Sequence, residues 1–169
     1  MNQLPAINPA PALSGTERDI LLTLFDLGRK VASVIDLDEL LARIPELVRR
    51  LVPFDAFGVY FVSDRRQGLD LAYSVGYPEG ATGFHMSATD GILGRVVATQ
   101  QPVVVNDVAT DPAYVSIVPE MQSTLAVPLL HKSRSIGALN VLSRDRDRYS
   151  ERDVAILRQF AAHVATALV

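Results

Sequence analysis

The spacing of apolar residues changes twice along the chain, and this change limits the folds that the chain can adopt. Residues 16–35 and 36–52 carry apolar side chains three and four positions apart, which predicts two amphipathic helices. Residues 56–143 show the pattern of short strands separated by turns, and residues 151–169 return to the helical spacing. Helices at both ends with antiparallel hairpins between them predict an α+β fold, in which one sheet packs against the terminal helices.

The middle of the chain predicts two antiparallel hairpins. Residues 56–62, AFGVYFV, are almost continuously apolar, which is typical of a strand covered on both faces. Residues 69–77 alternate, which predicts four apolar side chains on a single face: Leu69, Leu71, Tyr73 and Val75. Residues 123–143 form the second hairpin. Pro128 has no N–H to donate to a neighbouring strand, so we expect an edge or an irregularity there.

Capping residues and one proline refine the predicted helices. Asp36 with Glu39 and Ser150 with Asp153 have the spacing of capping boxes, in which each side chain accepts a hydrogen bond from the other residue's backbone. Pro45 lies inside the second helix, where it removes a backbone donor and crowds the preceding turn. We therefore expect a kink at Pro45 or two short helices in place of one.

The connecting segments differ in length and composition. Residues 91–101 predict a short helix and residues 102–105 a short strand. Residues 106–122 form a loop with one short helical turn, and a loop of this length in a compact domain tends to be functional. Residues 1–15 contain three prolines and predict a flexible tail or linker, which leaves residues 16–169 as one domain.

Composition excludes several classes of function. The chain has no cysteine, which removes disulfides, thiolate nucleophiles and iron–sulfur clusters. A net charge of −3 argues against a nucleic-acid partner, which would need a basic surface. No apolar run reaches the roughly 18 residues that span a bilayer, so we expect a cytoplasmic domain without membrane contact. The three histidines show no metal-ligand spacing, and we expect no metal site.

Four segments in this order resemble the GAF domain family, the sensory domains of bacterial signalling proteins. They are GILGRVVATQQPVVVNDVATDPAY (91–114), STLAVPLL (123–130), SIGALNVLS (135–143) and YSERDVAILRQFAAHVATALV (149–169). The resemblance extends over most of residues 17–169. It implies a central antiparallel sheet of five or six strands, with the N- and C-terminal helices on one face. Short helices and loops on the other face would enclose a ligand pocket.

The resemblance suggests which residues line that pocket. The 106–122 loop would form its wall, with Asn106 and Asp107 bonding a polar ligand edge and Tyr114 stacking on it. The same three residues would serve equally well as turn caps and packing residues. Further candidates come from the hairpins, the short helix and the loop before it, and ordinary core packing is an alternative for each: Phe57, Tyr73, Phe84, Ile92, Val96, Ser123 and Leu125.

Catalytic motifs are missing from the sequence, with no GxSxG elbow, phosphate loop or GxGxxG turn. Some GAF relatives reduce methionine sulfoxide, but this chemistry uses cysteine thiolates. We therefore predict that the chain is not an enzyme and has no catalytic residue. No particular cofactor is indicated.

The family resemblance implies a regulatory domain that senses an unidentified small molecule. The last helix reaches Val169 without a Gly or Asn cap, so we expect it to continue into a further module. That effector would be a histidine kinase, a phosphatase, a cyclase or a transcription activator. Apolar stripes on the terminal helices predict a homodimer formed through them. The alternative is a dimerisation or scaffold domain without a ligand.

Overall fold

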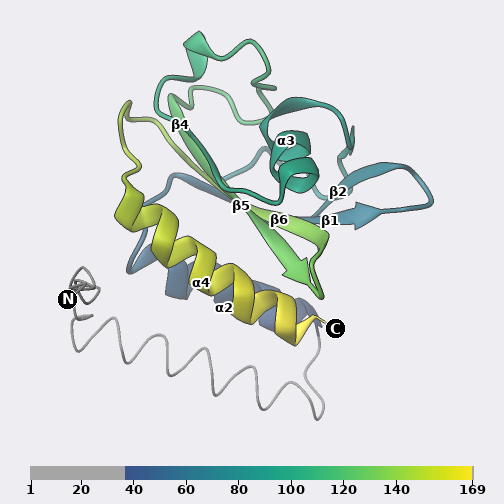
Figure 1. The fold of residues 1–169 in the computed structure, drawn as a ribbon. Helices are drawn as coiled ribbons and strands as arrows, with labels where there is room; N and C mark the ends of the chain where they lie inside the picture. The colour runs from purple at the N-terminus through teal and green to yellow at the C-terminus, as the bar shows by residue number, and fades with distance from the viewer. Residues whose placement is uncertain (1–36, 169) are drawn as a thin grey trace, which may run out of the picture.

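A computed structural model describes residues 37–168 of the chain, with one six-stranded antiparallel sheet at its centre (Figure 1). The strand order is β3-β2-β1-β6-β5-β4, which confirms the α+β prediction. The predicted helix 16–35, the Asp36 cap and the tail 1–15 lie outside the described residues. The strands are β1 (Ala56–Ser63), β2 (Gly68–Val75), β3 (His85–Ser87), β4 (Val103–Val105), β5 (Ser123–His131) and β6 (Arg134–Ser143).

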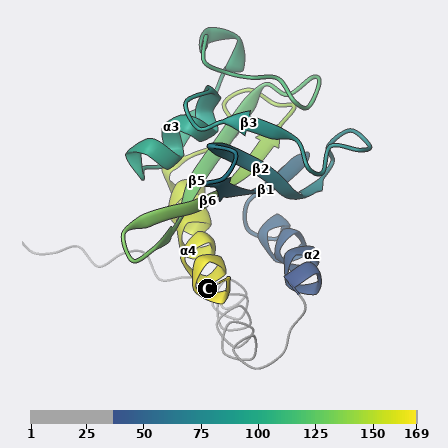
Figure 2. The same ribbon diagram turned by 90° about the vertical axis from the view of Figure 1, so that its right-hand side faces the viewer.

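One face of the sheet is covered by α2 (Leu37–Arg49) and α4 (Glu151–Ala167), which lie on the same side of the sheet in Figure 1 and in Figure 2. Their apolar stripes meet the inward side chains of the central strands in the larger core of the molecule. Its fully buried members come from both helices, from the turn after α2 and from strands β1, β5 and β6: Ile44, Val48, Val52, Phe57, Val59, Leu125, Val127, Leu129, Leu139, Val141, Leu157 and Phe160.

The opposite face of the sheet is covered by the short helix α3 (Gly91–Thr99) and the loop that follows β4 (Figure 2). A second, smaller core lies here, and it contains side chains from β1, β2, β5, β6 and α3. The loop contains the short 3₁₀ helix η1 (Val108–Thr110), which confirms the predicted helical turn. The sheet therefore separates two apolar layers, one under the terminal helices and one under α3 and the loop.

A β-bulge in β2 makes the predicted alternation of residues 69–77 wrong. Val59 of β1 pairs with Tyr73 and Tyr60 pairs with Leu71, so Ala72 is an extra residue in β2. Leu69 and Leu71 belong to the core under α3. Beyond the bulge the strand reverses its faces, and the side chains that follow pack on the core under the terminal helices: Tyr73 and Val75.

The predictions at Pro45, Pro128 and Ser150 have different outcomes. Helix α2 continues through Pro45 as one helix of 13 residues, so of the two predicted alternatives the pair of short helices is wrong and the kink stays a prediction. Pro128 lies beyond the part of β5 that pairs with β4, residues Thr124–Ala126, and therefore stands where β5 becomes an edge. The capping box of Ser150 and Asp153 is present, and the Ser150 N–H donates to Asp153 Oδ2 at 2.9 Å.

Within residues 37–168, none of the helices is both long enough and apolar enough to cross a membrane.

Candidate functional site

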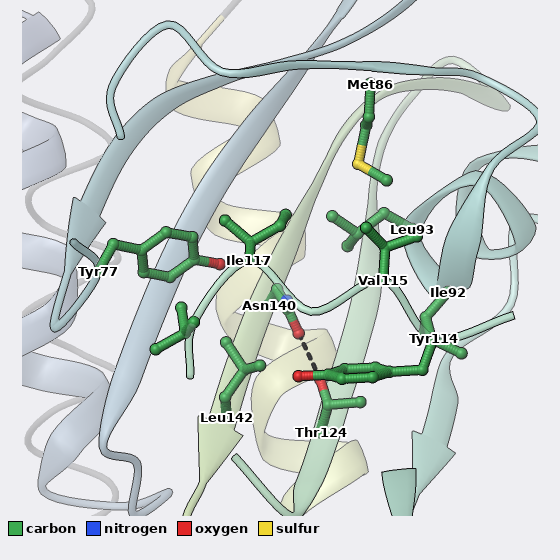
Figure 3. Close-up of a pocket in the computed structure, with 11 residues that line it drawn as sticks. Tyr77, Met86, Ile92, Leu93, Tyr114, Val115, Ile117, Thr124, Asn140 and Leu142 are labelled. Carbon is green, nitrogen blue, oxygen red and sulfur yellow. Dashed lines mark hydrogen bonds between the residues drawn. The ribbon is translucent and has the colours of Figure 1, made fainter. Parts of the chain in front are cut away.

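A small cavity lies between α3, the loop 111–122 and the sheet (Figure 3). The space left for a water-sized molecule is about 20 Å³, which is enough for one water. Helix α3 forms one wall and strands β5 and β6 the floor. The cavity is lined by Tyr77, Met86, Ile92, Leu93, Tyr114, Val115, Ile117, Val118, Thr124, Asn140 and Leu142.

The roof of the cavity is formed by residues 114–118. Tyr114 N–H still donates to the Asp111 carbonyl at 3.1 Å, and the stretch without hydrogen bonds begins after it. Before it, the Asp111 side chain accepts from Ala113 N–H at 2.9 Å. After it, Gln122 N–H donates to the Ser143 carbonyl at 2.7 Å. Within the described part of the chain, residues 115–121 take part in no hydrogen bond. Apolar contacts alone hold this stretch, which is typical of segments that open at low free-energy cost.

Polar side chains at the cavity are mostly paired with one another. The Thr124 hydroxyl donates to Asn140 Oδ1 at 2.7 Å, a bond drawn as the dashed line in Figure 3. The hydroxyl oxygens of Tyr60 and Tyr77 lie 2.9 Å apart. The Tyr114 hydroxyl is different, because among the described residues it is the buried side-chain polar atom that has no hydrogen-bond partner. An unpaired buried hydroxyl costs about 1–3 kcal/mol, so this group is available for a ligand.

Burial keeps the tyrosines near the cavity uncharged at neutral pH. It raises the pKa of Tyr77 to about 12, and it also raises the pKa of Tyr60 and of Tyr114 above the usual value of 10. The cause is desolvation, since a phenolate would lose its hydration in this apolar layer. At neutral pH the three hydroxyls therefore act as neutral hydrogen-bonding groups.

These raised pKa values predict a loss of stability in alkali. Above pH 10 the unfolded chain releases tyrosine protons that Tyr60 and Tyr77 retain in the folded state. The free energy of unfolding is expected to fall as the pH rises from 10 toward 12, by up to about 1.4 kcal/mol per pH unit for each proton. Urea denaturation at pH 8, 10 and 11 measures this slope. Tyr77→Phe should reduce it, and an unchanged slope in that variant would contradict the role of Tyr77.

Two of the residues predicted to bind a ligand line the cavity, and Val96 lies close by in the same layer. Ile92 projects from the first turn of α3, and Tyr114 enters from the roof. Val96 is fully buried in the core under α3, one turn further along the helix. The short helix and the loop therefore meet at the cavity, as the spacing of the sequence segments suggests.

The structure places three other predicted pocket residues on the wrong face of the sheet. Phe57 and Leu125 are fully buried under the terminal helices. Tyr73 lies on that face as well, because of the bulge at Ala72. For Phe57 and Leu125, the structure agrees with the alternative prediction, which is ordinary core packing. Phe84 is exposed to 39% and does not line the cavity.

The remaining predicted site residues hold the backbone near the loop. Asn106 Nδ2 donates to the Tyr149 carbonyl, and Asn106 Oδ1 accepts from Tyr149 N–H, both at 3.2 Å. Asp107 caps η1 by accepting from Ala109 N–H at 3.1 Å. The Ser123 hydroxyl donates to the Asp145 carbonyl at 2.6 Å. These side chains fix the loop to the segment that precedes α4 and leave the cavity to its other residues.

Sequence reasoning missed the polar side chains of the cavity floor. Asn140 interrupts the apolar run of β6, and it is 8% exposed in the folded chain. A buried amide within such a run was a signal, because it requires a hydrogen-bonding partner. The partner is Thr124. In the hairpin Thr124 pairs with Leu142, which lies two residues after Asn140, so only the register of the hairpin brings Thr124 and Asn140 together.

Solved structures with the same fold include sensory and catalytic proteins. The GAF domain from a phosphoenolpyruvate-protein phosphotransferase of Coxiella burnetii is 18% identical, with a TM-score of 0.79 over 92% of this chain and 95% of that chain. A free methionine-R-sulfoxide reductase from Neisseria meningitidis, in complex with its substrate, is 25% identical, with a TM-score of 0.77 over 97% and 95% of the two chains. Among proteins with curated descriptions, none matches the sequence.

The prediction that this chain is not an enzyme is overturned by these structures. Besides the Neisseria protein, a type II free methionine-R-sulfoxide reductase from Thermoplasma acidophilum has the same fold, at 23% identity and a TM-score of 0.69 over 86% of this chain and 94% of that chain. Missing motifs and the regulatory character of many relatives therefore do not exclude catalysis on this fold. The inference from the sequence was wrong because it took the absence of known catalytic motifs and of cysteine as evidence against any enzymatic function.

A family model described as GAF domain matches residues 34–169, which include both layers of the sheet and the cavity. The strand order, the terminal helices on one face and the short helix with its loop on the other agree with the solved GAF structures. The chain belongs to the GAF domain family.

Proposed function

We propose that this GAF domain is a regulatory module of a signal-transduction protein and binds a small molecule in the cavity under residues 114–118. Ligand binding would change the position of the roof, and the sheet would pass this change to the terminal helices and to an effector module. The effector would be a histidine kinase, a phosphatase, a cyclase or a transcription activator.

The observation that carries this proposal is the Tyr114 hydroxyl, buried at the cavity without a partner. A buried hydroxyl without a hydrogen bond destabilises the empty domain, and a ligand that supplies the bond removes this cost. The stretch 115–121, free of hydrogen bonds, provides a wall that can move to admit the ligand.

Strand β5 supports the proposed path from the cavity to the helices. Thr124 lines the cavity, and Ala126 belongs to the core under α3. Leu125 and Val127 alternate with them and point into the core that contains α4. A shift of β5 therefore displaces side chains on both faces of the sheet, since each face packs at the density of a protein interior. Allosteric coupling further requires that the ligand bind two states unequally, by about 1–3 kcal/mol.

A scaffold domain without a ligand is the second candidate, and the size of the cavity favours it. The space of about 20 Å³ holds one water and no metabolite until the roof moves. Met86 and Tyr114 line the cavity between α3 and the sheet, whereas Phe84 does not. The two candidates differ in a single measurable property, which is whether any small molecule stabilises the domain.

Tyr114→Phe separates the two candidates. Removal of an unpaired buried hydroxyl is expected to raise the free energy of unfolding of the empty domain by about 1 kcal/mol. In a thermal-shift screen against a metabolite panel, the sensor proposal predicts at least one compound that raises Tm, and a smaller rise with this variant. A panel without any stabilising compound would favour the scaffold.

A matched control is the same chemical change at Tyr149, whose hydroxyl donates to the Pro53 carbonyl at 3.0 Å. Tyr149→Phe removes a satisfied hydrogen bond, so we expect it to lower the free energy of unfolding by about 1 kcal/mol. It should leave the ligand-dependent rise in Tm unchanged. Equal effects of the two substitutions on stability would contradict the special position of Tyr114.

We also propose that the domain forms a homodimer through its terminal helices. A groove of about 400 Å³ lies between the edge of β5 and the outer side of α4, and Leu130 on its rim is 37% exposed. Sedimentation equilibrium of the 169-residue chain tests this proposal. A monomer at high micromolar concentration would contradict it.

A further inference from the structure

We infer that the cavity selects an uncharged, mainly apolar ligand with one hydrogen-bond acceptor, which accepts from the Tyr114 hydroxyl. This inference rests on the proposed function, because it names the class of ligand for the same cavity. It depends on the charges, the hydrogen bonds and the shape of the lining, which are separate observations.

The lining provides no counter-charge for an ion. None of its described side chains is acidic, basic or a histidine, and seven of the eleven lining residues are apolar. Its two tyrosines, Tyr77 and Tyr114, are held neutral by burial. A carboxylate, phosphate or ammonium group moved into this layer would lose its hydration without gaining an ion pair. Charged metabolites are therefore excluded in favour of neutral ones.

The N-terminus of helix α3 carries a partial positive charge that would favour an anion, and it lies at the wall of the cavity. Two observations oppose an anion there. The N-cap residue Asp90 already places a carboxylate at this end of the helix. Apolar side chains also cover the first turn, since a Cβ atom built on Gly91 would lie 3.3 Å from both Met86 Cε and Val115 Cγ2.

Among the hydroxyls of the cavity, one is left to donate to an acceptor on a ligand. Thr124 donates its proton toward Asn140 Oδ1 at 2.7 Å and the Val141 carbonyl at 3.1 Å. Tyr77 shares a hydrogen bond with Tyr60. Tyr114 alone among these hydroxyls lacks a partner, and a phenolic hydroxyl donates readily to a carbonyl or ether oxygen or to an aromatic nitrogen.

The roof determines how the ligand enters. Val115 is 44% exposed although it lines the cavity, and it belongs to the stretch without hydrogen bonds. Outward movement of this residue opens the cavity from the solvent side, where the flexible Met86 side chain can also change its rotamer. The closed cavity has space for one water only, so small probes with a single ring are the ones to test first.

Three probes of similar shape test this inference: acetophenone, benzoate and cumene. Acetophenone is neutral and has a carbonyl acceptor, benzoate carries a charge, and cumene has a methyl group in place of the carbonyl oxygen. We expect NMR titration of the 169-residue chain to give a dissociation constant for acetophenone at least tenfold lower than that for benzoate. Cumene should bind about fivefold more weakly than acetophenone, the factor that corresponds to one hydrogen bond.

Tyr114→Phe provides the control for the hydrogen bond. In this variant acetophenone and cumene should bind equally well, while the preference for acetophenone over benzoate remains. Backbone amide shifts should map the binding to Ile92, Thr124 and Asn140, which come from three elements around the cavity. Shifts confined to other residues would overturn the inference, as would a difference between acetophenone and cumene that persists in the variant.

Failure of the inference can be distinguished from failure of the proposed function. If benzoate binds at the cavity as tightly as acetophenone, the inference of a neutral ligand is wrong, whereas the sensor proposal stands. If no probe shifts the cavity residues and no metabolite raises Tm, both the inference and the sensor proposal are wrong.

Discussion

Phe57→Ala is expected to lower the free energy of unfolding by about 3–5 kcal/mol, although the sequence suggested that Phe57 binds a ligand. The side chain is fully buried under α2 and α4, with its ring 5.5 Å from that of Phe54. Alanine would remove most of these contacts and leave a cavity between sheet and helices. Urea denaturation measures the effect, and a fall in Tm of about 10 °C should accompany it.

Phe84→Ala is the matched control, since it makes the same chemical change at another residue that the sequence placed in the pocket. Phe84 is 39% exposed, and we expect a change of no more than about 0.5 kcal/mol. The ligand-dependent rise in Tm should survive in both variants, provided that Phe57→Ala is folded at the temperature where the scan begins. A loss of ligand binding in Phe57→Ala without a loss of stability would contradict its placement under the helices.

Gly137→Val should be equally damaging, and for a different reason. Gly137 pairs with Phe61 at the centre of the sheet, and a Cβ atom there would overlap the carbonyl oxygen of Tyr60. The obstacle is backbone, which cannot rotate away as a side chain does. Strands β1 and β6 would have to separate at this point, so we expect a loss of at least about 3 kcal/mol or failure to fold.

Gly80→Ala is the comparison for Gly137→Val. A Cβ atom on Gly80 would meet nothing within 4 Å, and only its left-handed backbone, with φ at +79°, opposes a side chain. That conformation costs about 1–2 kcal/mol in other residues. Circular dichroism during urea denaturation measures both variants. A Gly137→Val protein as stable as Gly80→Ala would show that β1 and β6 tolerate a side chain between them.

The element order could be predicted from the sequence because it depends on local signals. Apolar spacing distinguishes α4 from the strands before it, and the Ser150 and Asp153 pair marks where that helix begins. The edge at Pro128 follows from a missing N–H group, which is also a property of one residue. The sequence left open whether α2 continues through Pro45, because packing on the sheet, which compensates for a local weakness, decides between the two alternatives.

The candidate site was less predictable, because it is assembled from segments far apart in the chain. Ile92 and Tyr114 were found through their place in the short helix and the loop. Thr124 and Asn140 depend on the register of β5 and β6, which no local pattern specifies. The family resemblance located the pocket region but not its lining, since it could not tell which face of the sheet Phe57 occupies.

The extra residue at Ala72 has a consequence for chain-length variation. Deletion of Ala72 would turn the rest of β2 over, so that each side chain after it faces the other side of the sheet. Tyr73 and Val75 would then face α3, and Ser74 would face the terminal helices. Residues 64–67, between β1 and β2, lie outside both strands, so insertions there alter neither surface. Libraries that vary loop length should therefore recover many functional clones at 64–67 and almost none at position 72.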